Sequence, residues 1–425
     1  MRRQVLNFVG LFLAIALSVV GCQQLPLPIN PPQQEIVTVK LSGWGASPAE
    51  QKLLRSVLQD FSASHPHIHV KYEVIADQYM DVLKTRLVGD AAPDVFYLDA
   101  LEAPFLMQQG VLEPLNDYVT PDFEIGDFEP RLLNSFQHHG KIYGFPKDCS
   151  TLALFYNQKA FADVGLDKPP QTWEELRIYA KKLTRDTNND GKIDQYGLGE
   201  VPELARHAYK INAFGGEVIN SQGFAQFYTP ASINGLKSMI EQYRQERTSV
   251  QKTDVGTNSP SEMFGQGKVA MVIEGNWAIP YLKSTFPHLD FATAELPKIN
   301  NRPSTMVYTV AYVMNAKSHH KQAAWELISY LTGKEGMEKW TGTGFALPTR
   351  KSVATKLGYD QDILRAPLVA GVDYATPWQV GEYPTAIVSS FDNQFISAML
   401  GQQSLPQALQ RAQNDANKLI KSLKL

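Results

Sequence analysis

The sequence predicts an α/β protein whose first part is built from parallel βαβ units. Three stretches read as strands: IVTVKLSGW, the alternating HIHVKYEVI, and APDVFYLDA, which ends with Tyr97 and Asp99. Two helix-like stretches separate them: AEQKLLRSVLQDFSASHP, which stops before Pro66, and a shorter one over residues 79–88. Strands that alternate with helices at this spacing favour a parallel sheet.

Length and strand order also indicate where a ligand would bind. The chain has 425 residues, 44% of them hydrophobic, which predicts two or more domains with sizeable cores. In open α/β sheets, ligands bind beyond the carboxyl ends of the strands. Trp44, Tyr97 and Asp99 occupy such positions.

The N-terminus reads as an export signal. Arg2 and Arg3 precede an apolar run over residues 6–20, which is too short and too early for a membrane span. The run ends in VVGCQQ, which resembles the lipobox of bacterial lipoproteins and predicts lipidation of Cys22. An ordinary signal peptide with a chance cysteine is the alternative. We assign residues 1–21 to the signal and 22–35, rich in Pro and Gln, to an extended tether.

Charge and cysteine content exclude some classes of protein. Removal of residues 1–21 leaves 38 basic and 43 acidic residues, a net charge of −5. This mild acidity argues against nucleic acid or an anionic surface as the partner. Cys149 is then the one cysteine left beyond Cys22, so neither an internal disulfide nor a cysteine zinc site is expected in the folded domain.

The clearest predicted helix is TWEELRIYAKKLTRDT. Thr172 and Glu175 have the spacing of a capping box at its start. We expect Trp173, Trp325 and Trp340 to be core residues, because all three lie inside predicted helices.

The stretch DTNNDGKIDQYG, which follows that helix, resembles a calcium loop. Ligands of an EF-hand loop would be Asp186, Asn188, Asp190, the carbonyl of Lys192, and Asp194. The twelfth position is glycine, so the bidentate carboxylate is missing unless Glu200 or a distant acid supplies it, and no second helix clearly follows. We therefore expect either a structural calcium ion or an ion-free polar turn, and not a calcium sensor.

Several segments together resemble the maltose-binding-like solute-binding proteins of ABC importers. They are the VGC of the lipobox, APDVFYLDA, YGFPKDCSTLALFYNQKAFADVGLDKPPQTWEELRIYAKKL, GLGE, NAFGGEVIN, GKVAMVIEGNWAI, WELISYLTGKEGMEKW and GQQSLPQALQRAQND. Their order and spacing cover essentially all of the mature chain.

The resemblance implies a two-lobed periplasmic binding protein-like fold, in which each lobe is a sheet flanked by helices and the ligand lies between the lobes. Crossings between lobes would fall near Pro146 and Lys147, near residues 292–294, and near residues 343–348. Lobe I would then comprise residues 36–147 plus 293–345, and lobe II residues 148–292 plus 346–425. Ligand would shift the equilibrium toward a closed form that the importer reads.

The resemblance also implies a sugar site. Sugars need aromatic faces for stacking and carboxylates or amides for their hydroxyls, and in similar proteins the tryptophan of the EGNW turn stacks on the sugar. The expected ligand-binding residues lie in loops or at strand ends: Trp44, Tyr97, Asp99, Asp148, Glu274, Asn276, Trp277, Tyr374 and Trp378. Arg350 either reaches the ligand or forms a solvated salt bridge.

The expected protein is a monomeric, non-enzymatic receptor that presents a sugar or sugar-like solute to permease subunits of an ABC importer. It would be held at the periplasmic or outer face of the cell membrane through its N-terminal lipid alone, and would need no cofactor. Alternatives are a polyamine, peptide or phosphorylated polyol on the same fold, or an exported carbohydrate-active enzyme. His65, His67 and His69 alternate and would share one face of a strand, which leaves a metal site as a minor alternative; GxSxG, HExxH and Walker motifs are absent.

Overall fold

The computed structural model describes residues 36–45 and 47–424. The predicted signal, the tether and Cys22 lie outside these described residues. None of the helices in the described ranges has the length and apolar character needed to cross a membrane.

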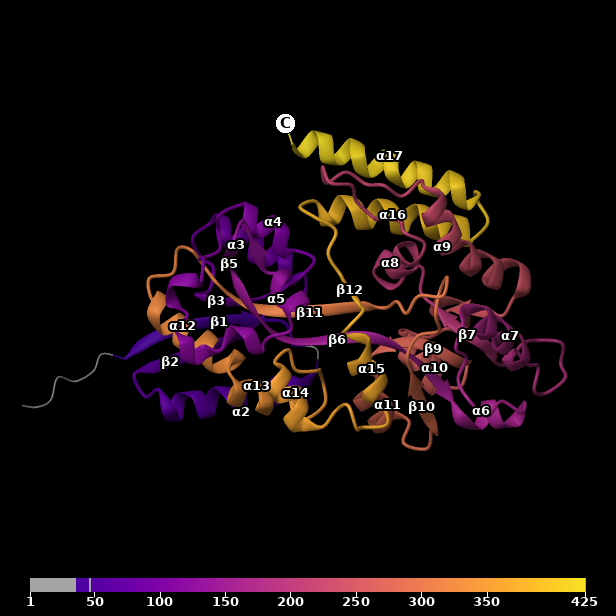
Figure 1. The fold of residues 1–425 in the computed structure, drawn as a ribbon, viewed down its shortest axis with the longest axis horizontal. Helices are drawn as coiled ribbons and strands as arrows, with labels where there is room; N and C mark the ends of the chain where they lie inside the picture. The colour runs from indigo at the N-terminus through magenta and orange to yellow at the C-terminus, as the bar shows by residue number, and fades with distance from the viewer. Residues whose placement is uncertain (1–35, 46, 425) are drawn as a thin grey trace, which may run out of the picture. The chain divides into compact units, whose positions relative to one another are not determined.

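A ten-stranded sheet runs through the described chain (Figure 1). The order of its main path is β2-β1-β3-β11-β6-β9-β7-β8, while β12 pairs with β11 and β10 with β6. A separate two-stranded sheet joins β4 (Gln137–His138) and β5 (Lys141–Ile142). The strands of the large sheet are β1 (Val37–Gly43), β2 (Ile68–Val74), β3 (Val95–Asp99), β6 (Gly144–Asn157), β7 (Tyr196–Glu200), β8 (Ser249–Gln251), β9 (Val269–Gly275), β10 (Phe291–Ala294), β11 (Met306–Met314) and β12 (Thr376–Pro377).

The predicted βαβ units at the start of the chain are confirmed. β1 pairs in parallel with both β2 and β3, and the helices α2 (Pro48–Ser64) and α3 (Tyr79–Val88) connect them. The Ser47 side chain accepts the Glu50 N–H at the start of α2, and the helix ends at His65, because the residue before a proline disfavours helical backbone.

Two long antiparallel strands, β6 and β11, join the two halves of the sheet. The first part of β6 pairs with β11 and its last part with β9 and β10. β6 is therefore the predicted crossing at Pro146 and Lys147. The predicted crossing at residues 292–294 is wrong: these residues lie in β10, which pairs with Leu154–Asn157 only, and β11 makes the return. Contacts place everything from Val37 onward in one compact unit, so the boundaries of the two lobes stay a prediction.

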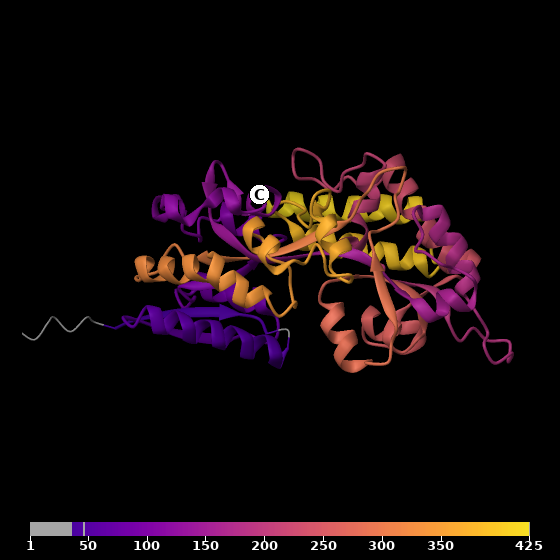
Figure 2. The ribbon, with the colours of Figure 1, turned by 60° about the horizontal axis from the view of Figure 1, so that its bottom comes forward.

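Helices cover both faces of each half of the sheet and produce four hydrophobic clusters. In the first half, one face packs on α2 and on α12 (Lys321–Thr332), α13 (Lys334–Thr341) and α14 (Lys351–Leu357), and the other on α3 and α4 (Ala103–Gln108), with α5 (Pro130–Asn134) close by. In the second half, one face packs on α6 (Gln158–Asp163), α7 (Trp173–Leu183), α8 (Leu204–Ala213), α9 (Pro230–Ile240), α16 (Pro384–Met399) and α17 (Leu405–Leu423), and the other on α10 (Pro260–Gly265), α11 (Ala278–Thr285) and α15 (Ala366–Gly371). Figure 2 shows α16 and α17, in yellow, side by side.

The short helices lie in connections: the 3-10 turns η1 (Asn116–Tyr118), η2 (Pro121–Phe123), η3 (Ile125–Asp127) and η5 (Lys252–Val255), and the π-helix η4 (Glu241–Glu246). Trp173, Trp325 and Trp340 are buried, as predicted. The Thr172 hydroxyl caps α7 by accepting the Glu175 N–H at 3.1 Å, whereas the Glu175 carboxylate accepts the N–H of Gln171 and not that of Thr172. The predicted capping box is thus half formed.

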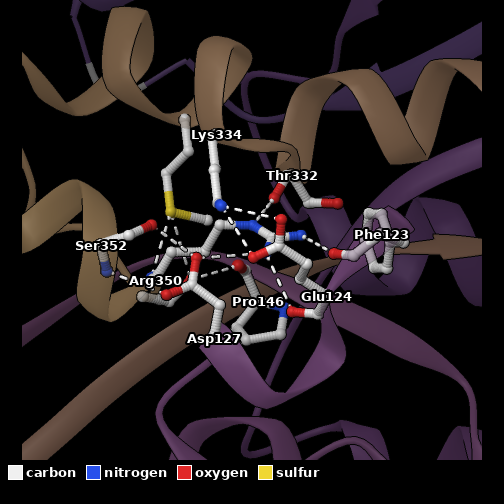
Figure 3. Close-up of polar contacts among 10 residues, drawn as sticks. Phe123, Glu124, Asp127, Pro146, Thr332, Lys334, Arg350 and Ser352 are labelled. Atoms are coloured by element: carbon white, nitrogen blue, oxygen red, sulfur yellow. Dashed lines mark hydrogen bonds and ion pairs between the residues drawn. The ribbon is translucent and has the colours of Figure 1, made fainter. Parts of the chain in front are cut away.

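Arg350 is a structural residue rather than a ligand contact (Figure 3). Its side chain is buried, and its Nε donates to the carbonyl of Thr332 at 2.6 Å. The two terminal nitrogens donate to the carbonyls of Phe123 and Glu124, at 2.9 and 3.2 Å, and one of them lies 3.4 Å from Oδ2 of Asp127. Arg350 therefore ties the η2–η3 segment to the end of α12, and neither of the two expectations for it is met.

Candidate ligand-binding site

A row of three residues crosses the middle of the sheet between two of its hydrophobic clusters. Val310 of β11 lies opposite Asp99 on β3 and opposite Asp148 on β6. Directly paired residues point to the same face, so both carboxylates flank Val310. Val310 is partly exposed although it lies in a central strand. We call Asp99, Val310 and Asp148 the central strip.

An irregularity in β6 shapes this strip. The register shifts between Val310 and Ala311, because Val310 faces Asp148 whereas Ala311 faces Pro146. Lys147 is thus an extra residue, a β-bulge that re-aims its side chain. The Lys147 Nζ lies 4.8 Å from the centre of the Tyr97 ring and 4.2 Å from that of Trp340, and it pairs with Oδ2 of Asp148.

Aromatic residues form a wall on the side of β3. The Trp44 ring meets the rings of Tyr79 and Tyr97 edge-on at 5.1 and 5.2 Å, and Tyr97 meets Tyr312 at 5.3 Å. The Tyr79 hydroxyl donates to the carbonyl of Tyr97 at 2.9 Å. Gly43 is needed beside this wall, since an added Cβ would lie 2.7 Å from the Tyr97 ring.

A second wall, on the side of β9, is organised by Glu274. Its buried carboxylate accepts hydrogen bonds from Ser261 Oγ at 3.0 Å, Arg206 Nη1 at 3.1 Å and the Trp277 indole N–H at 2.9 Å. The Trp277 ring is 38% exposed and meets Tyr308 edge-on at 5.8 Å. An added Cβ on Gly275 would overlap that ring, so glycine there lets the indole fold back onto Glu274.

The two walls stand on the same strand. Tyr308, Val310 and Tyr312 alternate along β11 and so share one face, with Tyr308 in contact with Trp277 and Tyr312 with Tyr97. Four residues of strand separate the two tyrosines by roughly 13 Å. The two tyrosines therefore mark the two ends of the central strip.

Two of the three carboxylates around the strip are balanced by a neighbouring cation. Lys147 pairs with Asp148, and Arg206 with Glu274. Burial raises the pKa of Asp99 to about 6, although the N–H of Glu102 opposes the rise by donating to its carboxylate. With a pKa of about 6 the Asp99 carboxyl is mostly ionised at pH 7, so Asp99 carries a charge of the strip that has no ion-pair partner among the described residues.

Six of the nine predicted residues come together in this arrangement: Trp44, Tyr97, Asp99, Asp148, Glu274 and Trp277. The other three do not. Asn276 is fully buried; its side-chain amide donates to the carbonyl of Gly344, and its backbone N–H donates to Ser150 Oγ. The Tyr374 hydroxyl bonds to Glu295 at 2.7 Å. Trp378 is buried and lines a separate hollow of about 390 Å³ beside α8 and Thr376.

Four participants were missed from the sequence: Lys147, Arg206, Tyr308 and Trp340. Trp340 was assigned to the core; it is buried, but its indole N–H donates to Asp148 Oδ2 at 2.7 Å. The alternation of Tyr308 and Tyr312 in VYTVAYVMN signals a shared face and could have identified Tyr308. No local pattern singles out Arg206, because its partner is 68 residues away.

The calcium-like loop lies between α7 and β7. The Asp186 carboxylate accepts the Gly191 N–H at 2.8 Å, Asp190 accepts the Lys192 N–H at 2.8 Å, and Asp194 accepts the N–H and hydroxyl of Thr187. Asn188 accepts the N–H of Asp190 at 2.9 Å. Within the described ranges, no three His, Cys, Asp or Glu side chains gather as they would around a metal. Calcium binding stays a prediction, and Glu200, which is buried beside Lys210, is engaged elsewhere.

The histidines expected on one strand face are arranged differently. β2 begins at Ile68, so His65 and His67 precede it. His65 stacks on Phe61 with ring centres 4.3 Å apart, and His67 Nε2 lies 3.1 Å from Glu326. The His65 ring is thus a packing residue, and the His67 ring makes a polar contact with a carboxylate.

Comparisons with known proteins place the chain. The family model of the bacterial extracellular solute-binding protein matches residues 45–338. A putative binding protein of Brucella abortus is 27% identical over 309 residues, which cover 71% of this chain and 74% of the relative. The maltotriose-binding protein of Pyrococcus abyssi is 25% identical over 303 residues, or 67% and 60% of the two chains.

Solved structures show the same fold. An ABC substrate-binding protein from Listeria monocytogenes in complex with cycloalternan superposes with a TM-score of 0.81 at 20% identity, covering 91% of this chain and 100% of that one. The maltose/maltodextrin-binding domain of Bdellovibrio bacteriovorus bound to maltotriose gives a TM-score of 0.76 at 24% identity, with coverages of 91% and 100%. The predicted fold class is confirmed, and so is the prediction of a binding protein rather than an enzyme. The chain belongs to the bacterial extracellular solute-binding protein family.

Proposed function

We propose that this protein captures a neutral saccharide over the central strip and presents it, chemically unchanged, to an ABC importer. The observation that carries the proposal is the pair of aromatic walls that contact Tyr308 and Tyr312, which lie roughly 13 Å apart along β11, with the carboxylates of Asp99 and Asp148 beside Val310 between them. Aromatic faces pack on the C–H faces of sugar rings, and carboxylates accept hydrogen bonds from sugar hydroxyls.

The balance of charge favours a neutral solute over the alternatives. A polyamine would need several unpaired carboxylates, whereas Asp99 is the one carboxylate of the site without an ion pair among the described residues, since Asp148 and Glu274 pair with Lys147 and Arg206. A phosphorylated polyol would need a free arginine or a helix N-terminus, and the one arginine of the walls, Arg206, is bound to Glu274. A neutral polyhydroxyl ligand disturbs neither pair.

Relatives support the same ligand class. The Streptococcus mutans relative, 24% identical over 302 residues, is a multiple sugar-binding protein, and the Pyrococcus abyssi relative binds maltotriose. Another, from Streptococcus pneumoniae, is a maltooligosaccharide ABC transporter solute-binding lipoprotein. From these names we propose that this protein also binds a sugar, that permease subunits of an ABC transporter are its partner, and that a lipidated Cys22 anchors it. We further propose that it is a monomer.

Titration calorimetry of the chain from residue 23 onward tests the ligand class, with glucose, maltose, maltotriose and mannotriose as probes. At least one should bind, and Trp277→Ala should weaken its binding by about 1–3 kcal/mol, the cost of truncating an aromatic anchor. Tyr228→Ala is the matched control, because Tyr228 is similarly exposed, at 45%, and contacts neither wall. Chromatography of the sugar after incubation should return it unchanged; cleavage would support an enzyme instead.

Equal affinity in Trp277→Ala and wild type would refute the placement of the site while leaving the ligand class standing. If the wild-type protein binds none of the four sugars in the calorimeter, the proposed ligand class is refuted.

A further inference from the structure

Another hollow, separate from the one beside α8, lies near β7 and β8. It has a volume of about 600 Å³, and we call it the basic hollow. Four segments build it: the calcium-like loop, the start of β7, the region from η4 to η5 and the end of α16. Its lining residues are Gly191, Lys192, Ile193, Tyr196, Tyr243, Arg244, Arg247, Ser249, Val250, Asp254, Met399 and Leu400.

Three cationic side chains line the basic hollow without a counter-charge. Lys192, Arg244 and Arg247 form no ion pair with any carboxylate in the described part of the chain, although ion pairs are common elsewhere in it. The one acidic lining residue is Asp254, whose carboxylate accepts hydrogen bonds from the Tyr243 hydroxyl at 3.0 Å and the Gln251 N–H at 3.1 Å. The hollow thus carries an excess positive charge on a chain whose formal net charge is −3.

The backbone under these residues is unusual. Arg244 belongs to the π-helix η4, and Arg247, which caps it, has left-handed backbone with φ of 54°. π-Helical turns and left-handed non-glycine residues are rare and gather at functional sites. The Arg244 guanidinium lies against Gly401 in the α16–α17 turn, where an added Cβ would be 2.5 Å from Nη2. The guanidinium thus lies close to the backbone of Gly401, and its N–H groups have no hydrogen-bond partner within residues 36–45 and 47–424.

The buried hydroxyl of Ser249 is a further polar group in the basic hollow. Ser249 is 2% exposed and lines the hollow, and its Oγ has no hydrogen-bond partner among the described residues. Buried hydroxyls in native proteins are nearly always bonded, and Ser249 lines the same hollow as Arg244 and Arg247, so its Oγ is available to an acceptor from outside the chain. The carboxylates of Asp186, Asp190 and Asp194 are close in sequence to Lys192, but they accept hydrogen bonds inside their own loop and do not line the hollow.

We propose that the basic hollow is an anion-binding site that takes a phosphate group, separate from the central strip and independent of its sugar. Arg244 and Arg247 supply guanidinium forks that match phosphate oxygens two at a time. Lys192 adds a mobile charge, and the Ser249 hydroxyl donates from below. Tyr196 and Tyr243 give the remainder of a phosphate ester an aromatic surface. The phosphate can come from a soluble ester or from a phospholipid headgroup of the membrane to which the chain is proposed to be anchored.

Binding of sn-glycerol 3-phosphate, inorganic sulfate and neutral glycerol to the chain from residue 23 onward should be measured by calorimetry at low and high salt. Glycerol 3-phosphate should bind with a Kd of about 1 mM or tighter, and affinity should fall as salt is raised. The double variant Arg244→Gln/Arg247→Gln should lose at least roughly tenfold, and Ser249→Ala a smaller factor. Arg302→Gln is the matched control, because Arg302 is exposed and forms no side-chain contact in the described ranges.

Flotation with vesicles of phosphatidylglycerol and of phosphatidylcholine distinguishes the two sources. If the protein floats with phosphatidylglycerol vesicles alone, and the double variant does not, the ligand is a phospholipid headgroup. If the protein binds glycerol 3-phosphate but floats with neither kind of vesicle, the ligand is a soluble phosphate ester. No binding of any phosphate to wild type, or an equal loss in Arg302→Gln, would overturn the proposal. Sugar binding at the central strip should be the same in all these variants, so failure of one proposal leaves the other intact.

Discussion

Glu274→Gln is the substitution that most sharply tests the second aromatic wall. The Glu274 carboxylate is 1% exposed and accepts hydrogen bonds from Ser261, Arg206 and Trp277. Glutamine has nearly the same shape, so the change removes charge and acceptor capacity without opening a cavity. One carboxylate oxygen, which serves both Arg206 and Trp277, becomes an N–H₂ group that faces two donors.

The expected cost follows from the group left behind. The Arg206 side chain is 17% exposed, so its guanidinium loses its counter-charge in a poorly hydrated place. Removal of one partner of a buried ion pair costs about 3–5 kcal/mol, and an amide can recover part of this through its remaining oxygen. We expect Glu274→Gln to lower the free energy of unfolding by about 2–4 kcal/mol. Arg206→Met/Glu274→Gln should recover much of that loss, since no unpaired charge remains.

Urea denaturation followed by tryptophan fluorescence measures the stability, and calorimetry measures sugar affinity in the same variants. The double variant should stay weak in sugar binding, because its Trp277 ring has lost both the hydrogen bond to Glu274 and the Arg206 guanidinium 5.4 Å from its centre. A Glu274→Gln protein within about 0.5 kcal/mol of wild type, the range of an ordinary surface change, would refute this reading of the wall.

Three further predictions concern the rest of the fold. Arg350→Met should cost about 3–5 kcal/mol because it leaves Asp127 without its buried cationic partner and three carbonyls without a donor; Arg302→Met should change stability little, and equal denaturation midpoints would contradict the structural role. Burial raises the pKa of Asp99 to about 6, so the folded chain holds the Asp99 proton more tightly than the unfolded chain does. The contribution of this proton to the free energy of unfolding is complete below about pH 4 and is lost as the pH rises through 6. Asp99→Asn should therefore gain stability over wild type at pH 7, by on the order of 2 kcal/mol, and converge with it toward pH 4; a difference that does not vary with pH would count against a buried, titrating Asp99. If the loop of residues 186–194 binds calcium, a chelator should lower the melting temperature of the protein without abolishing sugar binding. An unchanged melting curve would contradict calcium binding by this loop.

Local patterns predicted much of the fold because they are fixed by short-range physics. The stop of α2 before Pro66 and the Thr172 cap of α7 each depend on residues within one or two turns. Trp44 and Tyr97 entered the candidate site because ligands bind beyond the carboxyl ends of strands in an α/β sheet, and Trp277 because the tryptophan of the EGNW turn stacks on the sugar in similar proteins; their role in binding stays a prediction.

Long-range pairing accounts for what sequence reasoning missed. The return through β11 rather than residues 292–294 depends on which strands pair, and the bulge at Lys147 is visible only in the register between two strands about 160 residues apart. Asn276 and Trp378 sit in turn-like sequence, but tertiary contacts bury both. For these two residues, a position in a predicted turn did not mean that the side chain is exposed.

A crystal structure of the mature chain with the sugar that binds most tightly would test the central claim most directly. Our account predicts a sugar ring over Val310, in contact with Trp277 on one side and with Trp44 or Tyr97 on the other, and with hydroxyls at Asp99 or Asp148. Electron density for the sugar away from β11, or a sugar that touches neither aromatic wall, would contradict it.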